Sequence, residues 1–90
     1  MPDSLRVLFG RVVRRRREAA GWSQEKLAGE VEPELTRNYI GMIERGETNP
    51  TLEVMASLAV AFDVTVSALI QEAEEARTAK AKPRSDKKKA

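Results

Sequence analysis

The chain has 90 residues, contains neither cysteine nor histidine, and carries a formal net charge of +2 at pH 7. These counts exclude disulfides, thiolate nucleophiles, imidazole bases and the usual zinc ligands, so we expect neither an enzyme nor a bound cofactor. The charge is uneven. Residues 1–70 carry 9 Lys or Arg against 10 Asp or Glu, whereas residues 71–90 carry 7 against 4. The basic balance therefore comes from the C-terminal end and says little about the folded part.

The hydropathy pattern gives no indication of a membrane or of export. No apolar run reaches the roughly 18 residues that a membrane helix needs. The first residues, MPDSLRVLFG, do not show the basic start, apolar middle and small cleavage site of a signal peptide. We therefore expect one small cytoplasmic domain with no membrane partner.

Caps and glycines mark the first two predicted helices. Apolar residues at helical spacing predict a first helix over about residues 5–20. Asp3 or Ser4 can cap its start, and Gly21 ends it. Ser23 then caps a short second helix. The residues expected to face inward in that helix are Leu27, Ala28 and Val31.

The rest of the chain divides into three further predicted helices. Pro33 stops the second helix because proline cannot continue a helix interior. Gly46 ends the third helix, and Asp63 suits the tight reversal after the fourth, since Asp tolerates a left-handed backbone. The predicted N-caps of the third, fourth and fifth helices are Thr36, Thr51 and Thr65. The expected inward-facing residues are Tyr39, Ile40 and Ile43, then Leu52, Met55, Ala56, Ala59 and Phe62, then Val66, Leu69 and Ile70. No segment is typical of a strand, so the sequence predicts an all-α fold.

The C-terminal segment QEAEEARTAKAKPRSDKKKA has good helix formers but no obvious second apolar face beyond Ile70. We predict that the fifth helix frays near residue 78 and that the chain is then disordered. This places a folded domain at residues 1–75 and a flexible basic tail at residues 76–90. Two interpretations of the tail remain open, an arm attracted to phosphates and a solubilising end.

The short connection between the second and third helices is typical of a helix-turn-helix, whose second helix enters the DNA major groove. That geometry gives a reason for the polar opening of the third helix, where Arg37 and Asn38 are expected to be exposed. An arginine fork matches guanine O6 and N7, and an asparagine amide matches adenine N6 and N7. The alternative is that both side chains only solvate a helix start.

Three motifs favour the first interpretation. WSQEKLA opens the second helix, TRNYIGMIERG forms the third, and Asn-Pro precedes the fourth. Together they resemble the phage repressor/Cro family, the xenobiotic-response-element (XRE) type of helix-turn-helix, over about residues 5–70. The resemblance implies a compact five-helix lambda-repressor-like domain. It also implies a sequence-specific transcription regulator, a repressor or operon controller, that binds a double-stranded DNA operator.

The resemblance implies roles for individual residues as well. Gln24 would hydrogen-bond a phosphate or brace the third helix. Met42 would touch a thymine methyl group or fill a gap at the core edge. Arg45 and Asn49 would touch the DNA backbone, which fixes register without specifying sequence. The full set expected at DNA is Gln24, Thr36, Arg37, Asn38, Met42, Arg45 and Asn49.

Arg17 and Glu44 are implied to form an ion pair that fixes the third helix to the first. Loss of one partner would leave a buried charge uncompensated, which costs about 3–5 kcal/mol when burial is deep. The run of four arginines at residues 14–17 resembles a nucleic-acid patch. Four consecutive residues, however, spread around the whole helix. We therefore expect most of this run to be a solvated surface.

The chain departs from the family pattern in two places. The segment EPEL lengthens the turn before the third helix by about two residues and adds Glu32 and Glu34. Gly41 lies in mid-helix, on or near the expected exposed face. There it would either permit close approach to DNA or make no contribution.

One recognition helix contacts only a few base pairs, so we expect a homodimer spanning half-sites about 34–36 Å apart. The candidate dimer surface consists of Val64, Val66, Leu69 and Ile70. The alternative is that these residues complete the core of the monomer. Three roles fit the resemblance, namely a phage-type repressor, a controller of a restriction–modification operon, and an antitoxin that also binds a toxin. A protein-interaction module of the same fold, with weak or no DNA binding, is the remaining alternative.

Overall fold

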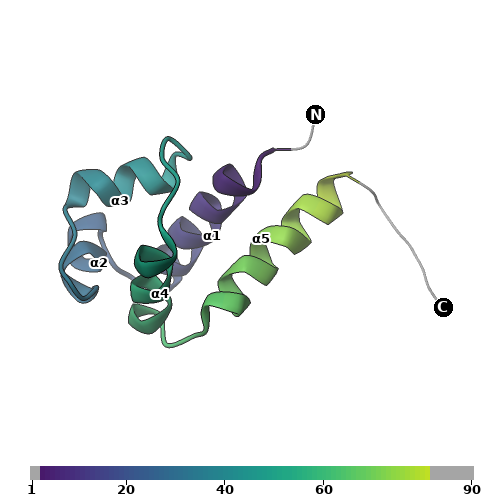
Figure 1. Ribbon diagram of the computed structural model, residues 1–90. Helices are drawn as coiled ribbons and strands as arrows, with labels where there is room; N and C mark the ends of the chain where they lie inside the picture. The colour runs from purple at the N-terminus through teal and green to yellow at the C-terminus, as the bar shows by residue number, and fades with distance from the viewer. Residues whose placement is uncertain (1–2, 82–90) are drawn as a thin grey trace.

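The computed structural model describes the backbone of residues 3–81 and the side chains of residues 3–77. It contains helices joined by short connections (Figure 1), and no strand occurs between residues 3 and 81. The helices are α1 (Leu5–Ala19), α2 (Gln24–Glu30), α3 (Arg37–Glu44), α4 (Leu52–Ala61) and α5 (Val66–Ala81). The all-α class and the order of five helices are therefore confirmed. Within the described part, no single helix is long and apolar enough to cross a membrane. The segments 52–61 of α4 and 66–77 of α5 reach that length and apolar composition only when taken together. They are bent by 99° relative to each other.

The N-caps lie where the sequence places them. At α1 the cap is Ser4, whose Oγ accepts a hydrogen bond from the backbone N–H of Val7 at 3.4 Å. The equivalent bond is accepted at 3.0–3.1 Å by Ser23, Thr36, Thr51 and Thr65. Each bond satisfies a backbone donor that has no partner inside the helix. The reversal after α4 uses Asp63 at φ 60°, as expected for a residue that tolerates this conformation.

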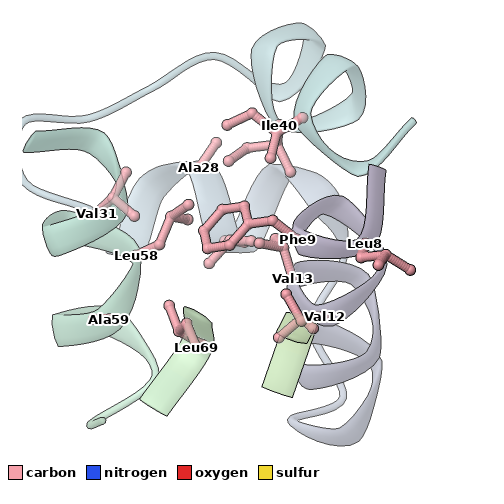
Figure 2. Packing of buried hydrophobic residues seen from close by; sticks show 13 residues of the cluster. Leu8, Phe9, Val12, Val13, Ala28, Val31, Ile40, Leu58, Ala59 and Leu69 are labelled. Carbon is pink, nitrogen blue, oxygen red and sulfur yellow. The ribbon is translucent and has the colours of Figure 1, made fainter. Parts of the chain in front are cut away.

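The hydrophobic core takes side chains from all five helices, with Phe9 near the middle of the cluster (Figure 2). Burial of each large apolar side chain contributes about 1.5–3 kcal/mol. In Figure 1, α5 lies alongside α1, and this pair and the α1–α3 pair make the most extensive helix contacts. The buried apolar residues are Leu8, Phe9, Val12, Val13, Leu27, Ala28, Val31, Ile40, Ile43, Leu58, Ala59, Leu69 and Ala73. The core therefore fixes α3 against α1.

The buried face of α4 differs from the prediction. Leu52, expected to face inward, is 71% exposed, whereas Leu58 is completely buried. Val60 is also exposed, at 77%. The sequence LEVMASLAVA has apolar residues on every side of the helix, so periodicity alone does not select a face. Packing against the other helices selects it.

The C-terminal helix extends further than predicted. α5 continues to Ala81, beyond the expected fraying point and the boundary expected at residue 75. Ala73 is fully buried and Ala76 packs against the core, so the core-facing side of α5 extends beyond Ile70. Alanines spaced three or four residues apart form one face, and they allow α5 to lie close to α1. The tail from residue 82 onward lies outside the described residues.

The arginine run on α1 is divided among different sides of the helix, as helical geometry predicts. Arg14 pairs with Glu18 at 3.1 Å, and its side chain is 64% exposed. Arg15 Nη2 lies 3.7 Å from a carboxylate oxygen of Glu72 on α5. Arg16 pairs with the same carboxylate. The run therefore helps to join α1 to α5, a role that the sequence did not indicate.

The lengthened turn between α2 and α3 is tied to the rest of the domain at two points. The backbone N–H of Leu35 donates to the carbonyl of Ala28 in α2 at 3.1 Å. The hydroxyl of Ser57 in α4 donates to the carbonyl of Glu32 at 2.8 Å. Because both bonds hold the turn backbone, the extra residues do not leave the start of α3 unattached.

Candidate nucleic-acid interface

The opening turn of α3 presents polar side chains outward. Ile40 and Ile43, on the opposite side, are 0% and 1% exposed and anchor the helix in the core. Arg37 and Asn38 are both exposed. Helical geometry places residues 37, 38, 41, 42 and 45 on the side away from the isoleucines. We call these five positions the outer face of α3. Two of the predicted base-contacting residues therefore lie together at its N-terminal end.

Met42 lies at the border between the outer face and the core. It is half-buried, and its sulfur is 3.9 Å from Nδ2 of Asn38. An amide–thioether contact of this length is weak. Thr36 uses its hydroxyl to cap the helix, accepting from Tyr39 N–H at 3.0 Å. The exposed start of α3 is thus ordered by its cap, while contact of Met42 with a thymine methyl group stays a prediction.

The last turn of α3 is held by a buried carboxylate. Glu44 is 3% exposed at its side chain and forms the ion pair with Arg17 that the resemblance implied. The guanidinium binds it through two nitrogens, at 2.7 Å from Nε and 3.2 Å from Nη2. This hydrogen bonding raises the pKa of Arg17 above its ordinary value, with a further contribution from the charge of Glu44 and against the effect of burial. A bidentate pair of this kind fixes orientation as well as distance.

Two further contacts connect this ion pair to the helix-turn-helix. Nη1 of Arg17 donates to the carbonyl of Trp22 at 2.7 Å, just before α2 begins. Nε2 of Gln24, the first residue of α2, donates to Glu44 at 3.0 Å. Of the two roles expected for Gln24, the structure therefore displays the bracing one. α1, α2 and α3 meet at a single carboxylate.

Glycines allow α1 to approach the end of α3 closely. A Cβ at Gly10 would collide with the carbonyl oxygen of Ile43 and would come within 2.9 Å of that of Glu44. Gly46 has φ 74°, and a Cβ added there would lie only 2.8 Å from Cγ2 of Val7. The close approach at Gly10 is a feature that the sequence analysis missed. Its only signal was a glycine inside a strongly periodic helix, where glycine is otherwise unfavourable.

Gly41 lies in mid-helix on the outer face, as predicted, and the side chain of Arg45 lies beside it. Gly41 lies on the outer face but is buried rather than exposed. A Cβ at Gly41 would lie 3.0 Å from Nη1 of Arg45 and 3.7 Å from Nε2 of Gln24. Arg45 itself is 55% exposed and pairs with Glu47 at 3.0 Å. The hydrogen bond with Glu47 raises the pKa of Arg45 above its ordinary value, and the charges of Glu47 and Glu44 add to this.

Asn49 lies apart from α3, in the loop that leads to α4. It is exposed and, with Pro50, lines a shallow apolar groove of about 210 Å³. The other residues that line this groove are Leu5, Arg6, Phe9, Met55 and Ile70. A contact with the DNA backbone from this loop stays a prediction.

A family model and a curated relative both match this chain. Residues 13–69 match the family model described as helix-turn-helix. The control protein C.BamHI of Bacillus amyloliquefaciens is 42% identical over 65 residues, which make up 71% of this chain and 78% of that protein.

Two solved structures are similar as well. The clp gene regulator ClgR from Corynebacterium glutamicum aligns with a TM-score of 0.80 at 25% identity, over 90% of this chain and 84% of that chain. The restriction-modification controller protein C.AhdI from Aeromonas hydrophila aligns with a TM-score of 0.65 at 41% identity. That match covers 70% of this chain and 88% of that chain.

Proposed function

Because this chain belongs to the helix-turn-helix family, we propose that it is a DNA-binding transcriptional regulator whose α3 enters the major groove. The observation that carries the proposal is the construction of α3. Its first turn exposes Arg37 and Asn38, while its last turn is fixed to α1 and α2 through Glu44. A helix held at one end and exposed at the other can present side chains to base edges without moving relative to the domain.

The residues of the interface then have distinct roles. Arg37 and Asn38 contact guanine and adenine, respectively, and give sequence specificity. Met42, beside Asn38, contacts a thymine methyl group or packs at the core edge. Arg45 and Asn49 bind phosphates, which positions the domain on the duplex. Gln24, at the start of α2, braces α3 through Glu44, and Thr36 caps the first turn of α3.

The identity of the relatives favours one biological role. C.BamHI, at 42% identity, is a control protein, and C.AhdI, at 41%, is a restriction-modification controller. We propose that this chain likewise controls a restriction–modification operon rather than acting as a phage-type repressor or an antitoxin. The test is to find the neighbouring genes and to measure binding to the DNA upstream of them. Binding upstream of a methyltransferase or endonuclease gene is expected, and binding only beside a toxin gene would contradict the proposal.

We also propose that the chain binds DNA as a homodimer through α4 and α5. Leu69 belongs to the core of the monomer, so it is removed from the candidate dimer surface. Val64, Val66 and Ile70 are half-buried, and Val60 on α4 is 77% exposed. Sedimentation of the full chain would test this. Val60→Asp should shift the chain toward monomer without unfolding it, and an unchanged sedimentation coefficient would contradict the proposal.

A selection from random duplexes tests DNA binding itself. We expect enrichment of a two-fold symmetric site with half-sites one helical turn apart, about 34–36 Å. Failure to enrich any sequence, with scrambled DNA also unbound, would instead favour the protein-interaction module.

A further inference from the structure

The side chain of Arg45 lies back along α3 instead of pointing away from its end. Long side chains on a helix lean toward its N-terminus and cover the preceding turn. In α3 the position that Arg45 covers is Gly41, four residues earlier, and the guanidinium lies where a side chain at residue 41 would be. Together with Gln24, whose Nε2 lies 3.7 Å from the same position, Arg45 covers Gly41 and accounts for its burial on the outer face.

Gly41 lies in the middle of the outer face. Residues 37, 41 and 45 are spaced by four and therefore lie one above another. A methyl group at Gly41 would be 3.0 Å from Nη1 of Arg45, tighter than ordinary van der Waals contact. The guanidinium would therefore have to shift from this position by a few tenths of an ångström. The missing side chain thus brings the charge of Arg45 close to the helix surface, between Arg37 and the end of α3.

A carboxylate holds this guanidinium in the free protein. Nε of Arg45 donates to Glu47 at 3.0 Å, and the two side chains are 55% and 53% exposed. Glu44, the other carboxylate nearby, is already bonded to Arg17 and Gln24. Glu47 bonds only Nε, so it is the carboxylate whose negative charge competes with a DNA phosphate for this guanidinium. An exposed pair of this kind is weak enough for such competition.

We propose that Gly41 and Glu47 are positioning residues for Arg45. Gly41 provides the space in which the guanidinium lies against α3, and Glu47 holds its Nε and weakens its attraction to a DNA phosphate. The inference rests on the proposed function and deepens it. In this proposal Gly41 and Glu47 set the strength of the contact between Arg45 and a phosphate, and neither of them needs to touch DNA.

The first test is a double-mutant cycle on Arg45 and Glu47. Binding of a selected duplex and of its scrambled version is measured for the full chain, Glu47→Gln, Arg45→Ala and the double variant. Glu47→Gln should bind both duplexes about two- to five-fold more tightly, because the carboxylate no longer competes. Arg45→Ala should bind both duplexes more weakly. The plot of log K against log salt should also become less steep, by roughly 0.9.

The decisive result is the effect of Glu47→Gln when Arg45 is absent. In that background the gain in affinity should be no larger than the gain from Glu53→Gln. This control removes an exposed carboxylate from α4. An equal gain with and without Arg45 would overturn the proposal, because Glu47 would then act only through its charge. A wild-type chain that binds neither duplex would instead overturn the proposed function.

Gly41→Ala gives a second, independent test. Alanine favours a helix over glycine, so the melting temperature should rise while affinity for both duplexes falls about two- to five-fold. In the Arg45→Ala background the loss of affinity should disappear. If the loss persists there, the methyl group itself collides with DNA, and the role assigned to Gly41 is wrong.

Discussion

At the first turn of α3, Arg37 and Asn38 are exposed, whereas at its last turn Glu44 is 3% exposed and is bonded to Arg17 and Gln24. The two ends are close together, because α3 has only 8 residues. The buried end joins α3 to two other helices, while the exposed end carries side chains free to meet a ligand. The difference shows how one short helix can separate the residues that fix its position from those that it exposes to solvent.

The largest effect is expected at the buried end. Glu44→Ala would leave the Arg17 guanidinium buried without its carboxylate and would remove the acceptor of Gln24. We expect a loss of about 3–5 kcal/mol in the free energy of unfolding, measured by urea denaturation, with DNA binding reduced in parallel. Glu47→Ala is the matched control, because its carboxylate is exposed and should change stability by no more than about 0.5 kcal/mol. Normal stability with impaired binding in Glu44→Ala would contradict the structural role.

A second change tests how closely the buried end is seated on α1. Gly10→Ala would place a methyl group against the carbonyl of Ile43, which is backbone and cannot rotate away. We expect a destabilisation of about 1–3 kcal/mol from overpacking, although alanine is the better helix former. Gly29→Ala on α2 is the control, because its nearest neighbour would be 3.6 Å away, and should gain up to about 1 kcal/mol. A gain in both variants would mean that α1 and α3 are packed less closely.

The exposed end should give the opposite result. Arg37→Ala and Asn38→Ala should leave the free energy of unfolding within about 0.5 kcal/mol of the wild type. Each should weaken binding to the selected duplex by about 1–3 kcal/mol and relax the preference at a separate base pair. An equal loss on selected and scrambled duplexes would identify these residues as phosphate contacts. No loss on either would favour the protein-interaction module.

The smallest effect is expected away from both ends of α3. Arg14 is an exposed member of the arginine run and pairs with Glu18 four residues on. Arg14→Ala should cost about 0.3–0.5 kcal/mol of stability and should not change the preferred DNA sequence. A change of preferred sequence in a selection experiment would show that the run contacts bases after all.

Much of the candidate site could be predicted because its signals are local. The Thr36 cap, the end of α3 at Gly46 and the burial of Ile40 and Ile43 follow from cap chemistry and helical spacing. The exposure of Arg37 and Asn38 follows from the same spacing. The ion pair between Arg17 and Glu44 is different. The residues lie 27 positions apart, so only the family resemblance indicated it.

The remaining features depend on which surfaces meet, and the sequence does not specify that locally. Periodicity favoured Leu52 over Leu58 in α4, but a helix with apolar residues on every side can be buried on any of them. Ala73 is buried in the core, which requires α5 to continue alongside α1. The cover that Arg45 places over Gly41 likewise depends on how a long side chain lies in three dimensions. The sequence determined the helices, their caps and the polar start of α3, because those depend on neighbours within a few residues. The tertiary structure alone decided which leucine of α4 is buried, how far α5 belongs to the domain and where the charge of Arg45 lies, because those depend on contacts between distant segments.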